Sequence, residues 1–202
     1  MKVIKLFFHA AITVMIFVVL SVARPTKNPG RVKLIDPDRA LKMEIEINAP
    51  VQKVWWAWTT SEGLKTFFAP SNKIEFRVFG AYDFHFNPNA EAGGRGAEGN
   101  IILAIQSEKM LSFTWDAPPK YPDIRKQRTS VVLRFIKLSE NRTKLLFTQT
   151  GWGEGKDWDE VYNFFIPAWG GQVLPFLKYS LEHRPIDWNN PPSSLPKAKL
   201  IQ

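Results

Sequence analysis

The sequence predicts an α+β fold, in which a curved antiparallel sheet of about six to seven strands wraps around a long C-terminal helix. Between residues 43 and 150, several segments alternate apolar and polar residues with the period of two that half-buried strands show. Between residues 157 and 182, apolar residues recur at spacings of three and four, as they do on one face of a helix. Two short helical patterns follow the first strand. Because helices and strands are segregated along the chain, the pattern favours the α+β class.

The composition is that of one globular domain. The chain has 202 residues, of which 45% are hydrophobic and 23% charged, so wholesale disorder is not expected. It contains no cysteine, which excludes disulfides, thiolate nucleophiles, zinc–cysteine sites and iron–sulfur clusters. The net charge of +8 fits a solubilising surface, with anionic partners as the alternative. The sequence has no run of five basic residues and no nucleic-acid motif, so nucleic acid is not an expected partner.

Residues 1–23 are predicted to be a signal peptide or an N-terminal membrane anchor. Lys2 and Lys5 precede a long apolar run, and small residues follow it, which predicts cleavage near Ala23 and export to the periplasm or the exterior. The alternative is a membrane-anchored protein, because residues 6–23 approach the minimum length that spans a bilayer. In either case this segment is a candidate for contact with a membrane surface.

Residues 24–40 are expected to be a linker, because three prolines and a glycine lie there among scattered charges. The domain itself is predicted over residues 41–184. It begins with a strand at residues 43–47, where apolar and charged side chains alternate. Pro50 suits the first turn of the helix that follows, and a second short helix is expected over about residues 60–68.

The middle of the domain is predicted to be a series of antiparallel strands. Residues 73–78 and 82–87 alternate on either side of Gly80-Ala81, which predicts a hairpin with one aromatic face. The Gly- and Ala-rich stretch at residues 89–99 is expected to be a flexible loop and a candidate cavity gate. Four more strands are expected over residues 100–106, 110–116, 128–138 and 143–150.

The last element is expected to be a helix over about residues 157–182. Pro167 and Pro175 lie within it and are expected to kink it, which allows the helix to follow a curved sheet. Residues 185–202 contain four prolines and no periodicity, so this Pro-rich tail is expected to be extended or disordered.

Four short motifs, taken in their order and spacing, resemble a known superfamily. They are the strand-to-helix opening at residues 47–55, the block at 58–64, the strand Phe113-Thr114-Trp115, and the helix segment at 168–171 with the leucines after it. Over residues 41–182 the sequence resembles the SRPBCC superfamily of helix-grip proteins, which includes the START and Bet v 1-like proteins. Within it, the sequence is most similar to the Activator of Hsp90 ATPase homologue 1-like (AHSA1-like) branch. The resemblance implies a helix-grip fold with a hydrophobic ligand cavity between the sheet and the C-terminal helix.

The aromatic content makes such a cavity easier to form. Aromatic residues make up 13% of the chain, and a core of many large rings is hard to fill without gaps. The alternative is that the rings fill a closed core, as most apolar stripes do. The candidate ligand-binding residues that line the cavity are Trp55, Phe68, Phe76, Tyr82, Phe84, Phe113, Trp115, Gln149, Phe165, Trp169, Gln172 and Phe176.

The expected function is binding of a hydrophobic or amphipathic small molecule, of the lipid or aromatic class, with no cofactor and no metal. A protein-interaction module related to Hsp90 ATPase activators is one alternative. A cyclase- or hydratase-like enzyme is the other, and Tyr82, Gln149 and Gln172 are its candidate polar groups. Catalysis is not the favoured function, because His85 is predicted to point outward and no nucleophile motif is present. The acidic residues at 154–160 are interpreted as helix N-terminal residues, with a paired acid and base as the alternative.

Overall fold

The computed structural model describes residues 39–201, and the fold below is that of this part of the chain. The predicted signal peptide or anchor and nearly all of the predicted linker lie outside the described residues, so both stay predictions. Within the described part, no helix combines the length and the apolar character needed to cross a membrane.

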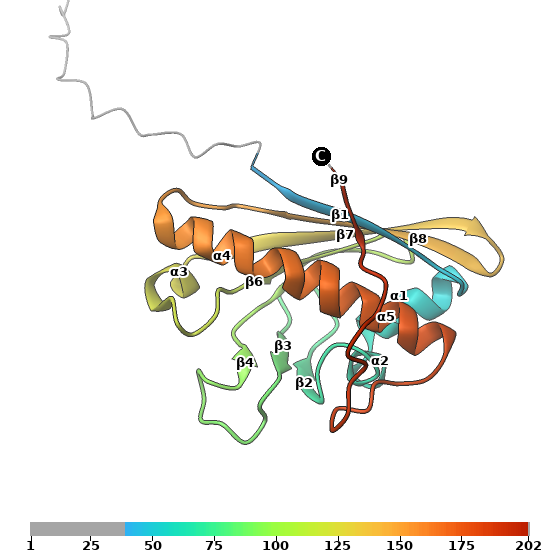
Figure 1. Cartoon of the computed structure of the whole chain (residues 1–202), viewed down its shortest axis with the longest axis horizontal. Helices are drawn as coiled ribbons and strands as arrows, with labels where there is room; N and C mark the ends of the chain where they lie inside the picture. The colour runs from blue at the N-terminus through green and yellow to red at the C-terminus, as the bar shows by residue number, and fades with distance from the viewer. Residues whose placement is uncertain (1–38, 202) are drawn as a thin grey trace, which may run out of the picture. The chain divides into compact units, whose positions relative to one another are not determined.

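The main layer is a six-stranded antiparallel sheet (Figure 1). In order across the sheet, its strands are β5 (Ile102–Gln106), β6 (Met110–Trp115), β7 (Thr129–Ser139), β8 (Arg142–Thr150), β1 (Leu41–Ile47) and β9 (Lys199–Ile201). The alternating burial of β1, β7 and β8 agrees with the period of two in the sequence, so one face of each strand packs inward. The predicted α+β class and the four strands after residue 100 are confirmed.

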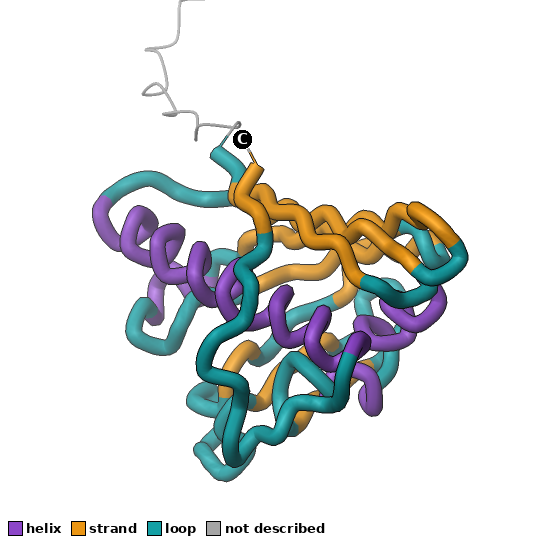
Figure 2. The backbone as a smooth tube through the Cα atoms, turned by 45° about the vertical axis from the view of Figure 1, so that its right-hand side comes forward, coloured by secondary structure: helices purple, strands orange, loops and turns teal. Residues whose placement is uncertain are grey.

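A long terminal helix crosses the inner face of this sheet, as Figures 1 and 2 show. It consists of α4 (Lys156–Pro167), a π-helical turn η1 (Ala168–Val173) and α5 (Leu174–Glu182). The predicted terminal helix is therefore confirmed, and the two expected kinks take the form of a π-helical turn that the two prolines flank. A proline ring clashes with the carbonyl four residues before it in an α-helix, and the wider π spacing accommodates such a residue.

Two short helices follow β1, as predicted. Helix α1 (Val51–Thr59) begins after Pro50, and α2 (Ser61–Lys65) is capped by Thr60, whose hydroxyl accepts a hydrogen bond from the Gly63 amide at 3.0 Å. Helix α2 ends at Lys65, three residues earlier than expected, and the turn that follows buries its aromatic side chains.

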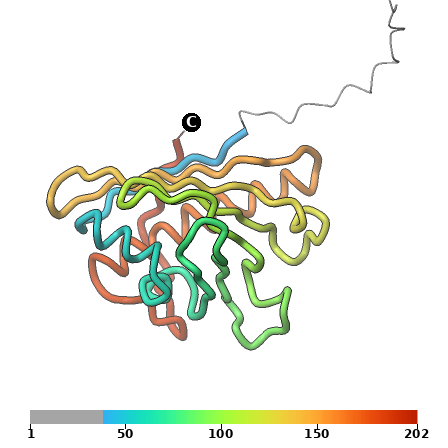
Figure 3. Tube along the Cα trace, turned by 180° about the vertical axis from the view of Figure 1, so that it is seen from behind, coloured from blue at the N-terminus to red at the C-terminus, as the bar shows by residue number. Residues whose placement is uncertain are grey.

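A second, three-stranded sheet extends away from the large one, and Figure 3 shows this part of the chain in green. It consists of β2 (Ser71–Ile74), β3 (Tyr82–His85) and β4 (Gly96–Ala97). The predicted hairpin is confirmed as a pairing of β2 with β3, but the first strand is shorter than predicted and does not reach residue 78. Strand β4 lies in the stretch predicted to be a flexible loop, where Gly96 pairs with His85.

The reason that β2 stops early is a competing pairing. After Ile74 the chain turns, and the amide of Phe79 donates to the carbonyl oxygen of Ile102 at 2.8 Å. The amide of Ile102 in turn donates to the carbonyl oxygen of Gly80 at 3.0 Å. The chain before β3 is thus hydrogen-bonded to the edge of the large sheet, and Phe76 is left 40% exposed.

Besides β4, two further elements lie where the sequence predicts none. Helix α3 (Pro122–Lys126) occupies the connection between β6 and β7. Strand β9 lies in the predicted tail and pairs antiparallel with β1, so the last described residues complete the large sheet. The hydrophobic core fills the space between this sheet, the terminal helix and α1, with Trp58, Phe113 and Phe147 fully buried.

Candidate functional site

An apolar cavity of about 360 Å³ lies beside the terminal helix, on the side of the small sheet. Its size falls within the range of about 300–1,000 Å³ that is usual for small-molecule sites. Gln172 is the single polar side chain in its wall, and within the described part of the chain the wall has no charged residue. The wall is formed by Phe68, Phe86, Trp115, Phe164, Phe165, Ala168, Trp169, Gln172, Val173, Phe176, Trp188 and Pro191. Eight of these twelve residues are aromatic.

The terminal helix supplies seven of the twelve residues of this wall, and its π-helical turn is central to it. Four of the six residues of η1 line the cavity. The turn can lie close to the large sheet because Gly170 has no side chain, since a Cβ atom there would lie 3.1 Å from the sulfur of Met43. π-Helical turns occur frequently at functional sites in proteins.

Three buried rings from different elements form the inner end of the cavity. The ring of Phe68, from the turn after α2, stacks on Trp115 of β6, with centroids 5.6 Å apart and 12° between the planes. Trp169 of η1 completes the group. Its ring centroid lies 4.8 Å from that of Trp115 and 5.7 Å from that of Phe68. These contacts connect the small helices, the large sheet and the terminal helix at one point.

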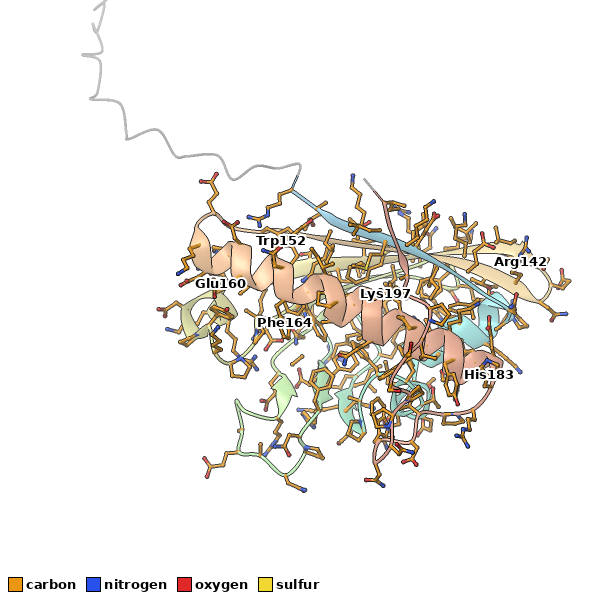
Figure 4. The ribbon with its side chains drawn as sticks, in the orientation of Figure 1. Arg142, Trp152, Glu160, Phe164, His183 and Lys197 are labelled. Carbon is orange, nitrogen blue, oxygen red and sulfur yellow. The ribbon has the colours of Figure 1, made fainter. Side chains whose placement is uncertain are left out.

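The opposite end of the cavity is open to solvent. Phe86, just after β3, is 49% exposed, and Phe164 on α4 is 50% exposed, although both line the cavity. Figure 4 shows Phe164 on the side of α4 that faces away from the large sheet, whereas Trp152 lies between that helix and the sheet. Because these two exposed rings line the same cavity and are not scattered singly over the surface, the opening is a candidate entrance.

A smaller hollow of about 150 Å³ adjoins the cavity and shares Phe86, Trp115, Phe164 and Phe165 with it. Its far end is formed by the loop after β6 and by Arg125 of α3. The shared residues make the two hollows one continuous apolar surface.

A buried ion cluster holds this far end in place. The carboxylate of Asp116 is buried and lies 2.7 Å from Nη2 of Arg125 and 3.3 Å from Nη1 of Arg128, and it accepts a hydrogen bond from Asn100 Nδ2 at 3.0 Å. Burial raises the pKa of Asp116, although the Asn100 hydrogen bond and both guanidinium groups oppose that change. Arg125 also donates to the carbonyl oxygens of Ala117 and Gly96, at 2.6 Å each. Because these charges satisfy one another, we interpret the cluster as structural.

The structure brings together six of the twelve candidate residues in the cavity wall. They are Phe68, Trp115, Phe165, Trp169, Gln172 and Phe176. They come from the turn after α2, from β6 and from the terminal helix. Periodicity directs Trp115, Phe165, Trp169 and Phe176 inward, whereas Gln172 is polar and exposed.

The other six candidates lie outside this wall. Phe84 and Phe113 are fully buried in the core, and Trp55 packs edge-on against Phe76 at 5.9 Å and Phe135 at 5.2 Å. Phe76 is itself partly exposed, because β2 ends before it. None of these four contributes to the cavity.

The two remaining candidates are polar, and both are used in the core. The hydroxyl of Tyr82 donates to the carbonyl oxygen of Trp58 at 2.6 Å, and burial raises its pKa well above the usual value. Gln149 donates from Nε2 to the Thr129 hydroxyl at 2.9 Å, and both residues are buried. Of the three polar groups that an enzyme was expected to use, only Gln172 lines the cavity.

Six lining residues were not among the candidates: Phe86, Phe164, Ala168, Val173, Trp188 and Pro191. Phe86 continues the alternating aromatic series of β3, and this signal identifies it in the sequence. Phe164 lies beside the apolar stripe of α4 and not on it. Trp188 and Pro191 belong to the tail, where no periodicity marks them.

The described residues show little that supports catalysis. Among residues 39–201, no group of three or more His, Asp or Glu side chains is arranged to hold a metal ion. In the acidic stretch, Asp159 forms an ion pair with Arg39 at 2.9 Å, and Glu160 accepts a hydrogen bond from the Tyr121 hydroxyl at 2.7 Å. That hydrogen bond lowers the pKa of Glu160. Asp157 and Asp159 lie in the first turn of α4, the location that the helix N-terminal interpretation requires.

Comparison with known families gives a match over most of the domain. The family described as Activator of Hsp90 ATPase homolog 1-like protein matches residues 48–176. This range contains the whole cavity wall except Trp188 and Pro191. No curated protein matches the chain.

Several solved structures share the fold. A protein from Mesorhizobium loti has a TM-score of 0.57 and 22% identity, over 71% of this chain and 97% of its own. The Aha1 dimer from Colwellia psychrerythraea has a TM-score of 0.51 and 23% identity, over 72% and 98% of the two chains. An Hsp90 activator from Plasmodium falciparum has a TM-score of 0.52 and 16% identity, over 67% and 90%. At these identities the similarity establishes the fold.

Proposed function

Because the chain belongs to the family of Activator of Hsp90 ATPase homolog 1-like proteins and carries an open aromatic cavity, we propose that it binds an uncharged apolar small molecule there. The observation that carries this proposal is the wall itself, in which eight rings surround a space of about 360 Å³. A closed core has no such space, and a site for a polar ligand has more than one polar side chain.

The chemistry of the wall favours an aromatic or polycyclic ligand. The wall has no charged group that would pair with a carboxylate or a phosphate, which disfavours a fatty acid or a phospholipid headgroup inside the cavity. Aromatic rings favour stacked and edge-on contacts with other rings. Gln172 offers one amide that can orient a single polar group of the ligand.

Burial of apolar surface is enough to give measurable affinity. Removal of about 400 Å² of apolar surface from water contributes about 10 kcal/mol. Association costs of about 4 kcal/mol or more reduce this value. The remainder corresponds to a dissociation constant of tens of micromolar.

A cavity-filling substitution tests the proposal. Ala168 lies in the wall and is half-buried, so Ala168→Trp is expected to place an indole ring in the cavity. Asn163→Trp is the matched control, because Asn163 lies on the same helix, is exposed and is not part of the wall. The measurement is the fluorescence of the uncharged probe N-phenyl-1-naphthylamine, with native mass spectrometry to detect ligands that copurify.

We expect Ala168→Trp to weaken probe binding by about tenfold or more and Asn163→Trp to leave it nearly unchanged. If Ala168→Trp and Asn163→Trp bind the probe with equal affinity, the probe binds outside the cavity. A native protein that binds neither this probe nor any other apolar molecule would exclude the proposed function.

Docking on a partner protein of the Hsp90 class is a second candidate function. The description of the family favours it, and so does an exposed apolar loop between β2 and β3, in which Phe79 is 70% exposed. Phe79 has φ of 61°, a conformation that Asn tolerates well, so Phe79→Asn removes the ring without changing the turn. Loss of binding to purified Hsp90 in this variant, but not in Ala168→Trp, would support the second function.

A further inference from the structure

The segment at residues 185–201, here called the C-terminal strap, lies along the domain and forms part of the cavity. Trp188 and Pro191 of the strap line the cavity, although the family match ends at Phe176. Figure 2 shows the strap as the loop that leaves the end of α5, passes across the terminal helix and reaches β9. Lys197 lies where the strap crosses the helix in Figure 4. This wall of the site is therefore an addition of this chain to the region that the family match covers.

The first anchor of the strap is the end of α2. The amide of Ile186 donates to the carbonyl oxygen of Thr66 at 2.8 Å, and the indole nitrogen of Trp188 donates to the carbonyl oxygen of Lys65 at 2.9 Å. Carbonyl groups at the end of a helix have no partner within the helix, so they are suited to bind a segment from elsewhere. The Trp188 ring also packs edge-on against Phe176, with centroids 6.4 Å apart.

The second anchor is a carbonyl group that a proline leaves free. The amide of Ala198 donates to the carbonyl oxygen of Gly170 at 2.9 Å, within the π-helical turn. In a π-helix that oxygen would accept from the residue five positions later, which is Pro175 and has no N–H. Strand β9 continues from this anchor, and Lys199 forms an ion pair with Glu44 of β1 at 2.9 Å.

The part of the strap between its anchors is weakly attached. In the described structure, residues 191–197 donate or accept no hydrogen bond with the rest of the domain. A segment with few hydrogen bonds and exposed backbone opens at low free-energy cost. Because the chain after Trp188 is unattached, Trp188 can leave the cavity once the two hydrogen bonds of the first anchor break, while the large sheet and the terminal helix stay intact.

We propose that the strap completes the ligand site, with Trp188 in direct contact with the bound molecule, and that its release sets the rate at which the ligand leaves. This inference rests on the proposed function of the cavity. The strap adds an aromatic wall to a ligand that would otherwise face solvent on that side, and a bound ligand in turn holds Trp188 in place.

Two substitutions of Trp188 distinguish the contact of its ring with the ligand from the hydrogen bond that anchors it to Lys65. Trp188→Ala removes the ring and the hydrogen bond to Lys65, whereas Trp188→Phe keeps a ring and removes only the hydrogen bond. Trp56→Ala is the control, because Trp56 is an exposed tryptophan of α1 outside the cavity. We expect N-phenyl-1-naphthylamine affinity to fall about tenfold in Trp188→Ala, about threefold in Trp188→Phe, and negligibly in Trp56→Ala.

A second experiment measures the opening of the strap through the probe dissociation rate and hydrogen exchange, and not through affinity. Ala198→Pro removes the amide that binds Gly170, and Ser194→Pro, in the unattached part, is its control. We expect Ala198→Pro to raise the probe dissociation rate about threefold or more, and bound probe to slow hydrogen exchange at the amide of Ile186 in the native protein.

The outcomes distinguish the strap from the cavity. If the native protein and Trp188→Ala bind the probe equally well, with equal dissociation rates, the strap has no part in the site and the cavity proposal stands. If Ala168→Trp also fails to weaken binding, the probe does not occupy the cavity and both proposals are overturned. Weaker binding in Trp188→Ala, with slower exchange at Ile186 in the native complex, supports both.

Discussion

Trp58, Phe84 and Phe113 are fully buried, whereas Phe86 and Phe164 are about half exposed, although all five are aromatic residues of one domain. The buried rings come from inward positions of α1, β3 and β6, where regular elements direct them towards one another. Of the exposed rings, Phe86 lies just after β3, where the strand has ended, and Phe164 lies within α4 but beside its apolar stripe. The comparison shows that the arrangement of the elements, more than the type of side chain, determines which aromatic residues form a closed core and which form an open cavity.

The largest expected difference between the two regions is in stability. Phe113→Ala should lower the free energy of unfolding by about 3–5 kcal/mol, because it leaves a void in a packed core. Phe164→Ala should lower it by about 1 kcal/mol or less, because that ring is half in water already. Urea denaturation monitored by circular dichroism measures both values. Similar losses in the two variants would mean that the cavity is as tightly packed as the core.

A smaller effect is expected at a polar contact inside the core, the hydrogen bond of Tyr82. Tyr82→Phe removes the hydroxyl that donates to Trp58, so a buried carbonyl loses its partner at a cost of about 1–3 kcal/mol. Burial raises the pKa of Tyr82 above its usual value of 10.0 in the folded protein, so the unfolded chain loses its proton first as pH rises. Stability from this group is therefore fully present below pH 10 and is lost progressively above it.

The measurement is the free energy of unfolding of both proteins between neutral pH and the highest pH at which unfolding stays reversible. The native protein should lose more stability than Tyr82→Phe as the pH rises above 10. Parallel curves for the two proteins would show that Tyr82 is accessible to solvent, contrary to its position in the core.

The smallest expected effect concerns the boundary between the cavity and the strap. Pro175→Ala restores an N–H that competes with Ala198 for the carbonyl oxygen of Gly170, so hydrogen exchange at the Ala198 amide should become about threefold faster or more. Pro167→Ala is the control, because no hydrogen bond of the strap depends on that residue. Unchanged exchange in Pro175→Ala would mean that the strap does not depend on the π-helical turn.

The regular elements were predictable because their periodicity is local. The alternation in β1, β7 and β8 and the helical spacing of α4 identified the sheet, the terminal helix and half of the cavity wall from the sequence. The early end of β2 has a different cause, which is competition from a distant part of the chain. Phe76 continues an alternating pattern, but the pairing of Phe79 with Ile102 ends the strand before it.

The strap was not predictable for a related reason. Nothing near Trp188 in the sequence indicates that its indole group meets the end of α2, since the partner carbonyl belongs to Lys65. From the sequence, the prolines of the terminal helix predict kinks, which are their local effect. The non-local effect of Pro175 is that the carbonyl of Gly170 has no partner within the helix and accepts a hydrogen bond from Ala198 of the strap. This partner cannot be identified from the sequence near Pro175.

The position of β1 has a consequence for the order in which the domain folds. Strands β5 to β8 follow one another along the chain and pair with their neighbours in sequence, so this meander requires only short loop closures. By contrast, Leu41 in β1 pairs with Gln149, and Lys42 pairs with Ile201. Pairings between such distant residues form slowly. We therefore expect the meander to form early in refolding, and β1 to join it in a later and slower phase.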